Sequence, residues 1–308
     1  MDSASVPSDA HEVSRMNSSP GKWGIDTWML EALPLERAVR TLDEAGIECL
    51  EYAYESFRRF EKEGTIRARI RALLDETSTC TIEPSQMHAP YGDLDVQLAA
   101  DDESARSQAI NCARHWLEYG NMLGVRVMVF HTVSRAIGGE LSAAQVSDAR
   151  DANLRAFKEI GRIAIDVGVK VAVENRLEGT YGSRPLDLLE IVSADPDALG
   201  VCLDTGHANV NRYVCGEFVK EVNDRLIATH IHDNDGRSDQ HLLPFMGNID
   251  WPLFARELNA ISYHGPLILE IPGSDHDERL CLNRLGLARE LLSSGLLKNE
   301  RTAWGIRS

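Results

Sequence analysis

Short apolar runs alternate with amphipathic stretches along most of the chain. Each apolar run has the length of a strand, and each amphipathic stretch repeats its apolar positions at helical spacing. The pattern predicts strands at residues 23–28, 47–52, 80–88, 125–131, 170–174, 199–204, 227–232 and 266–270. It predicts helices at residues 35–45, 57–76, 104–123, 143–167, 185–192, 217–225, 252–260 and 278–292. Eight alternating strand–helix units favour one parallel (β/α)8 barrel, the TIM-barrel arrangement.

Glycines support this order of elements. Four of them follow a predicted helix and precede a strand, where a left-handed residue ends the helix, namely Gly46, Gly124, Gly168 and Gly200. An open doubly wound sheet is the alternative, but no Gly-x-Gly-x-x-Gly motif follows a strand. We therefore expect residues 23–308 to form the barrel domain. Residues 1–22 are rich in Ser, Pro and Asp and are expected to form a disordered leader.

Composition narrows the class of protein and its partners. The chain has 308 residues, of which 43% are hydrophobic and 26% are charged, enough for one large core. No apolar run approaches the roughly 20 residues that span a bilayer, so we expect no membrane partner. The six cysteines are scattered without a Cys-x-x-Cys pair, which favours reduced thiols and a cytoplasmic location. The net charge of -16 repels phosphate backbones and makes nucleic acid a poor partner.

Carboxylates and imidazoles stand at the ends of six predicted strands. They are His88, His131, Glu174, Asp204 with His207, His230 with His232 and Asp233, and Glu270. In a parallel barrel these ends meet at one face, so the side chains are expected to converge. Each one alone is more typical of a structural or solvated group. Together, their burial without a cation would cost several kcal/mol each, which favours a shared metal site.

The residue types indicate which ion the site holds. Three carboxylates, from Glu174, Asp204 and Glu270, with one imidazole, from His232, suit an octahedral ion with open positions. We expect one divalent ion, with Mn²⁺ favoured and Mg²⁺, Co²⁺ or Zn²⁺ as alternatives. His207 is expected to orient ligands and substrate rather than to bind the ion.

Two motifs carry a resemblance to a known family. They are Leu-Asp-Thr-Gly-His-Ala at 203–208 and His-Ile-His-Asp-Asn-Asp-Gly at 230–236, the latter followed by Asp239 and by His-Leu-Leu-Pro at 241–244. Here the chain resembles the xylose-isomerase-like barrel superfamily of sugar isomerases and epimerases, which also contains the endonuclease-IV-like abasic-site endonucleases. The resemblance covers residues 23 to about 292 and agrees with the predicted barrel.

The ketose 3-epimerase branch implies roles for individual residues. One metal ion would be held by Glu174, Asp204, His232 and Glu270, and the two glutamates would move the proton. His207 matches a substrate-contacting histidine of that branch, and Arg237 falls near its substrate-contacting arginine. His88 and His131 join them as expected substrate-binding residues.

The endonuclease branch uses three metal ions and nine ligands. Its additional positions match His88, His131, His207, Asp239 and His241, and we take His230, Asp239 and His241 as candidate ligands or supporting groups. The chain also departs from both branches. Gly206 stands where the endonucleases usually have Cys, and those enzymes have a single His on strand seven. Phe245 replaces the first glycine of a Pro-Gly-x-Gly loop common in sugar-type relatives.

The favoured hypothesis is a metal-dependent sugar isomerase or epimerase acting on a ketose or keto-sugar. Glu174 would remove a proton beside the carbonyl and Glu270 would return one, or the reverse. A keto-glycoside lyase begins with the same proton abstraction. A trinuclear zinc phosphodiesterase acting on abasic DNA conflicts with the acidic charge. A non-catalytic subunit is a further alternative, and a homo-oligomer or a partner subunit is left open. Trp28, Tyr91 and Trp251 are either sugar-stacking faces or core residues.

Overall fold

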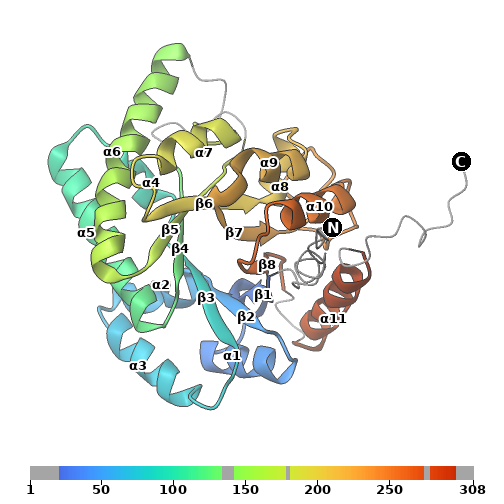
Figure 1. Cartoon of the computed structure of the whole chain (residues 1–308). Coiled ribbons are helices and arrows are strands. Elements are labelled where there is room, and N and C mark those ends of the chain that lie inside the picture. The colour runs from blue at the N-terminus through green and yellow to red at the C-terminus, as the bar shows by residue number, and fades with distance from the viewer. Residues whose placement is uncertain (1–20, 134–141, 178–180, 274–277, 296–308) are drawn as a thin grey trace, which may run out of the picture.

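The computed structural model describes residues 21–133, 142–177, 181–273 and 278–295. The expected leader lies outside the described residues, apart from Gly21 and Lys22. Eight parallel strands form a closed barrel in which each strand pairs with the next and β8 pairs with β1 (Figure 1). The strands are β1 (Trp23–Asp26), β2 (Cys49–Tyr52), β3 (Glu83–His88), β4 (Val127–His131), β5 (Lys170–Glu174), β6 (Leu199–Asp204), β7 (Leu226–Ile231) and β8 (Leu267–Leu269). The predicted (β/α)8 barrel is therefore confirmed.

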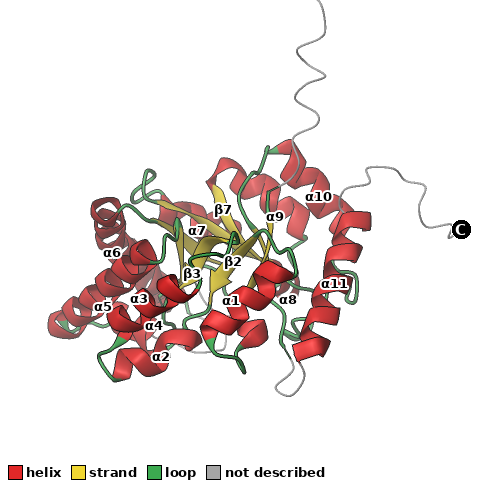
Figure 2. Cartoon of the chain, turned by 90° about the horizontal axis from the view of Figure 1, so that it is seen from below, coloured by secondary structure: helices red, strands yellow, loops and turns green. Residues whose placement is uncertain are grey.

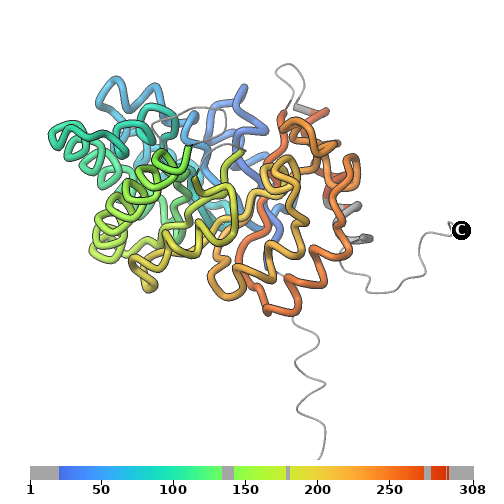
Figure 3. Tube along the Cα trace, turned by 90° about the horizontal axis from the view of Figure 1, so that it is seen from above, coloured from blue at the N-terminus to red at the C-terminus, as the bar shows by residue number. Residues whose placement is uncertain are grey.

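Helices surround these strands (Figure 2). They are α1 (Leu35–Glu44), α2 (Glu55–Lys62), α3 (Ile66–Glu76), α4 (Asp93–Leu98), α5 (Glu103–Met122), α6 (Ala143–Val167), α7 (Pro185–Val192), α8 (Thr205–Val210), α9 (Cys215–Val222), α10 (Trp251–Ala260) and α11 (Glu278–Gly295), with 3-10 turns η3 (Thr27–Leu30) and η4 (Asn223–Arg225). In Figure 3 the teal and green part of the trace lies on the left of the molecule and the orange part on the right.

Two details of the prediction were wrong. The single helix predicted at 57–76 is two helices, α2 and α3, because Gly64 between them has a φ of 67° and interrupts the helical backbone. Gly46, Gly124 and Gly168 have the expected positive φ, but Gly200 lies inside β6. A Cβ atom at Gly200 would lie 2.9 Å from the Arg225 carbonyl oxygen, so this glycine permits close packing of the neighbouring chain instead.

Side chains of the strands alternate between the barrel interior and the surrounding helices. Val127, Val129, Ala172, Cys202 and Ala228 form a buried cluster of their own inside the barrel. The outward neighbours on the same strands belong to the large core shared with the helices, as Val171 and Val173 do on β5. Because side chains alternate between the two faces of a strand, residues two positions beyond the inner cluster also face the barrel axis.

The cysteines are all free, as expected for reduced thiols, and four of the six are buried. Burial raises the pKa of the Cys49 thiol to about 12, which leaves it a poor nucleophile. In the described part of the chain, no helix combines the length and the apolar character that crossing a membrane requires.

Candidate metal centre and substrate cavity

Because side chains alternate along each strand, candidate ligands point into the barrel at its C-terminal end. His131, Glu174, Asp204 and His230 each stand two residues beyond a member of the inner cluster on the same strand. Glu174 is 2% exposed, and Asp204, His230 and His232 are fully buried. The pairing of His230 with Ile268 and of Ile231 with Leu269 brings the strand-seven histidines beside the residues that follow β8, where Glu270 lies.

The ligand atoms of these residues lie close enough to share an ion. Among the described residues, four groups have ligand atoms that all lie within 4.8 Å of one another. They are His88–Glu174–His230, His232–His241–Glu270, Glu174–Asp204–His207 and Asp204–His230–Glu270. The four predicted ligands are thus distributed over overlapping triplets. His230 belongs to two of these triplets and His232 to one, although the sequence favoured His232 as the ligand. The structure brings both histidines into the cluster.

Several buried atoms in the cluster have no hydrogen-bond partner. They include Nδ1 of His230, Nδ1 of His232 and Oε2 of Glu270. His230 Nδ1 lies 3.5 Å from Glu174 Oε2 and 3.6 Å from Glu270 Oε2, and His232 Nε2 lies 3.0 Å from Asp204 Oδ1. Unpaired buried polar atoms are costly, and a divalent cation among them would satisfy several at once. The donor set therefore fits a metal ion.

The carboxylates of the cluster have pKa values shifted in opposite directions. Burial by itself raises the pKa of Glu174, but the imidazoles of His230 and His131 outweigh it and hold that pKa well below its usual value. Burial is outweighed in the same way at Asp204, where His207 and His232 lower the pKa to about 2. Burial raises the pKa of Glu270, and the nearby Asp204 carboxylate adds to this shift. Opposed environments of this kind are typical of acid and base partners in active sites.

Four imidazoles of the cluster, those of His88, His207, His230 and His241, have pKa values raised in favour of the protonated form. Burial lowers the pKa of His88, but the hydrogen bond between its Nε2 and Glu174 raises it to about 9. Burial acts likewise on His241, and Asp239 raises that pKa to about 9. Since metal ligands must be deprotonated, an ion entering this cluster would displace protons.

Asp239 links two further histidines at the mouth. Its Oδ2 lies 3.4 Å from Nε2 of His207 and 3.0 Å from Nε2 of His241. These three residues are not one of the four compact groups found among the described residues, and neither are His88, His131 and Glu174. The cluster is therefore most compact around Glu174, Asp204 and Glu270.

A cavity of about 450 Å³ opens above the cluster. It is lined by Asp26, Trp28, Glu55, Arg58, His88, Tyr91, His131, Glu174, His207, His241 and Glu270. Trp28 and Tyr91 therefore face the cavity, whereas Trp251 is buried in the core with its indole N–H bonded to Asp233, so it is not a sugar-stacking face. Arg237 is exposed and lies outside this lining, and its contact with substrate stays a prediction.

Comparison with known proteins identifies the family. The model of the xylose isomerase-like TIM barrel family matches residues 39–294. The chain belongs to this family. Among the curated relatives of this xylose isomerase-like barrel is the uncharacterized protein MJ1311 of Methanocaldococcus jannaschii, 34% identical over 189 residues. The match covers 60% of this chain and 63% of MJ1311, so the chain spans less than two thirds of that relative.

Other similar proteins come from both branches of the resemblance. The probable endonuclease 4 of Nitratidesulfovibrio vulgaris is 27% identical over 265 residues, which is 78% of this chain and 89% of that protein. The crystal structure of a D-tagatose 3-epimerase-like protein is 27% identical, with a TM-score of 0.72 over 89% of this chain and 97% of its own. The IOLI protein, whose structure has a binding zinc atom, covers 91% of this chain and all of its own at a TM-score of 0.74 and 18% identity, which shows the fold alone.

Two departures from the family branches have structural consequences. A Cβ atom at Gly206 would lie 1.9 Å from Cε1 of His232, so the second histidine of strand seven has room only because residue 206 lacks a side chain. Phe245 has a φ of 71°, in the left-handed region that favours glycine, and its ring centroid lies 5.9 Å from that of Trp251. Phe245 therefore packs the loop against the buried Trp251.

Sequence reasoning missed several polar residues beside the cluster. Asp26 and Glu51 lie at or near the ends of β1 and β2, Gln86 lies on β3, and Asp95 lies on α4; all four are buried. Asp95 Oδ2 lies 3.5 Å from Nδ1 of His131. The period-2 pattern of inward positions, from Gly24 to Asp26 and from Cys49 to Glu51, was the signal that could have found two of them.

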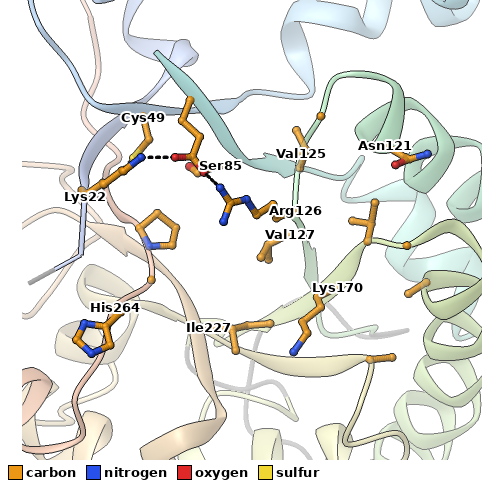
Figure 4. A pocket seen from close by; sticks show the side chains of 18 of the residues that line it. Lys22, Cys49, Ser85, Asn121, Val125, Arg126, Val127, Lys170, Ile227 and His264 are labelled. Atoms are coloured by element: carbon orange, nitrogen blue, oxygen red, sulfur yellow. Dashed lines mark hydrogen bonds and ion pairs between the residues drawn. The ribbon is translucent and has the colours of Figure 1, made fainter. Parts of the chain in front are cut away.

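A larger cavity of about 850 Å³ lies at the opposite end of the barrel (Figure 4). Its lining comes from the beginnings of the strands and includes Lys22, Arg126 and Lys170. Lys22 and Arg126 both pair with Glu83, so this end contains a solvated ion-pair network. Activity in barrels of this type is located at the C-terminal end of the strands, where the smaller cavity lies.

Proposed function

We propose that this chain is a divalent-metal-dependent isomerase or epimerase that moves a proton next to the carbonyl of a ketose or keto-sugar. The observation that supports it most is the convergence of Glu174, Asp204, Glu270 and the strand-seven histidines in one buried cluster with unpaired donor atoms. The similarity to a D-tagatose 3-epimerase-like structure supports an enzyme of this class.

The ligands we propose are Glu174, Asp204, Glu270 and an imidazole of strand seven, His232 or His230. The ion, for which Mn²⁺ is our first choice, would polarise the substrate carbonyl and make the neighbouring C–H acidic. Side chains of the cavity would bind the rest of the substrate. His88, His131 and His207 line it and can donate hydrogen bonds to hydroxyl groups.

Glu174 and Glu270 are the proposed proton carriers. Glu174 is the base, because its surroundings favour the charged carboxylate, and Glu270 is the acid, because its surroundings favour the protonated form. The reverse direction of the reaction exchanges these roles. The two residues approach the cavity from β5 and from the segment after β8, so a bound sugar can have one on each side.

The cavity also suits a small polar ring. Its volume of about 450 Å³ lies in the range of small-molecule sites. Tyr91 is 47% exposed and its hydroxyl group donates a hydrogen bond to Glu55, which fixes the ring at the mouth. We propose that Tyr91 and Trp28 provide aromatic faces for the sugar.

A deuterium-exchange experiment tests the proposal. The chain loaded with Mn²⁺ in D₂O is incubated with a panel of ketoses and keto-glycosides, and proton NMR detects exchange beside the carbonyl. We expect exchange with at least one sugar, and a loss of about 100-fold or more in Glu174→Gln and Glu270→Gln. Glu217→Gln, on the exposed surface of α9, is the matched control and should behave as wild type. No exchange across the panel would contradict the proposal, and release of a glycosidic substituent would indicate the lyase variant.

A phosphodiesterase is the second candidate, favoured by the contacts of Asp239 with His207 and His241 and by the similarity to an endonuclease 4. The net charge of -16 weighs against it, because binding a phosphate backbone requires clustered cations. Metal analysis separates the two candidates. Three zinc ions per chain, together with incision of an abasic-site duplex, would replace the isomerase proposal.

A further inference from the structure

Glu51 is a fully buried carboxylate below the metal cluster that the proposed reaction does not use. It lies on β2, and the pairing of β2 with β3 shifts register between Leu50 and Glu51, so that Glu51 stands opposite Gln86. Irregularities of this kind re-aim side chains and are frequent next to active sites. Ordinary strand alternation turns Glu51 into the barrel interior, where burying a carboxylate costs several kcal/mol unless partners compensate it. The extra residue of the irregularity, Ser85, lies on β3 and brings Gln86 beside Glu51 as one such partner.

The partners of Glu51 are both inside the barrel. Its Oε2 accepts a hydrogen bond from Nε2 of Gln86 and lies 2.9 Å from Nε2 of His230. Glu51 and His230 are both fully buried, and the His230 ring stacks 5.7 Å from that of His88. His230 is therefore held on one side by a carboxylate and on its face by another imidazole.

The other nitrogen of His230 faces the proposed catalytic carboxylates. Nδ1 lies 3.5 Å from Glu174 and 3.6 Å from Glu270, and it has no hydrogen-bond partner. A similar chain runs through His131, which lies 3.5 Å from Asp95 through Nδ1 and 3.5 Å from Glu174 through Nε2. A histidine fixed by a carboxylate on one nitrogen presents the other in a defined orientation, as ligands of metal sites commonly do.

We propose that Glu51 is a positioning residue of the metal centre, which acts by orienting His230 so that Nδ1 points between Glu174 and Glu270. The inference rests on the proposed function only in taking these residues as a metal site. It assigns Glu51 no contact with the substrate. Among the described residues, His230 is the histidine whose ring lies within 4 Å of both Glu174 and Glu270, so its bond to Glu51 bears directly on the proposed metal site.

The test uses Co²⁺ as the probe, because its affinity can be measured by calorimetry and its visible spectrum reports the ligand geometry. The metal-free chain and Glu51→Gln are titrated with Co²⁺ after circular dichroism has shown that both are folded. We expect affinity to fall about 10- to 100-fold and the spectrum to change. Glu48→Gln, an exposed glutamate before the same strand, is the matched control and should match wild type. Glu51→Asp is the second variant, since it keeps the charge but withdraws the carboxylate from His230, and it should lose affinity too.

A double-mutant cycle shows whether Glu51 acts through His230. In a His230→Asn background, Glu51→Gln should cause no further loss of Co²⁺ affinity. A folded Glu51→Gln or Glu51→Asp with wild-type affinity and spectrum would overturn the inference, and so would a full additive loss in the His230→Asn background. If the wild-type chain binds no Co²⁺, the inference fails together with the proposed function. If it binds Co²⁺ as described but exchanges no sugar proton, only the proposed function fails.

Discussion

At the scale of single residues, the site depends on a glycine, Gly206, as much as on the residues proposed to bind the ion. Gly206 lies between Asp204 and His207, and the His232 ring occupies the space that a Cβ atom would need. His232 cannot retreat easily, because its ring stacks 3.9 Å from His241 and Nε2 is bonded to Asp204. A glycine at this position and a second histidine on strand seven are therefore physically linked.

This link predicts the effect of Gly206→Ala. The added methyl group should displace the His232 imidazole from Asp204, and metal affinity should fall about 10- to 100-fold, as it does when groups that orient ligands are removed. Calorimetric titration with Mn²⁺ measures the change. Gly286→Ala is the control, because a Cβ atom there meets open space. Unchanged affinity in Gly206→Ala would show that the ring can move without loss.

At the scale of elements, strand ends and helix starts position the ligands together. Asp204 ends β6 and is also the N-cap of α8, where its Oδ1 accepts a hydrogen bond from the backbone N–H of His207. Its own backbone N–H donates to the side chain of Asn175, and the Asn175 amide donates to the Asp204 carbonyl. One junction therefore orients a proposed ligand and starts the helix that carries His207.

The two roles of Asp204 can be separated by substitution. Asn is as good an N-cap as Asp, so Asp204→Asn should keep the junction but lose most of the metal affinity. Asp204→Ala should lose the cap as well and be less stable than Asp204→Asn by about 1 kcal/mol. Denaturant unfolding of the metal-free variants and Mn²⁺ titration measure the two effects. Equal stability of both variants would contradict the capping role, and wild-type affinity in Asp204→Asn would contradict the ligand role.

The elements themselves were largely predictable, whereas their irregularities were not. Periodicity predicted all eight strands and the convergence of His131, Glu174 and Asp204, because side-chain alternation fixes which residues face the barrel axis. It could not predict Glu51 as a partner of His230. That contact joins β2 to β7 across the barrel interior, and which inward side chains meet there depends on packing rather than on local pattern.

At the scale of the whole molecule, acidic charge and a buried group of imidazoles are combined in one fold. The net charge is -16, yet His88 and His241 have pKa values raised to about 9 inside the barrel mouth. The carboxylates that raise these pKa values, of Glu174 and Asp239, belong to the proposed metal centre or contact it. Proton and metal binding are therefore expected to compete.

This competition predicts how stability varies with pH. A histidine whose pKa is raised from 6.5 to about 9 by folding contributes stability that is fully present below pH 6.5 and is lost as pH rises through about 9. The melting temperature of the chain in EDTA should therefore fall between pH 6.5 and 9. Mn²⁺ affinity should rise over the same interval as the imidazoles lose their protons. In the metal-free chain, combining His88→Gln with His241→Gln should make the melting temperature depend less on pH. If the melting temperature of this variant fell with pH as steeply as that of wild type, other groups would cause the pH dependence.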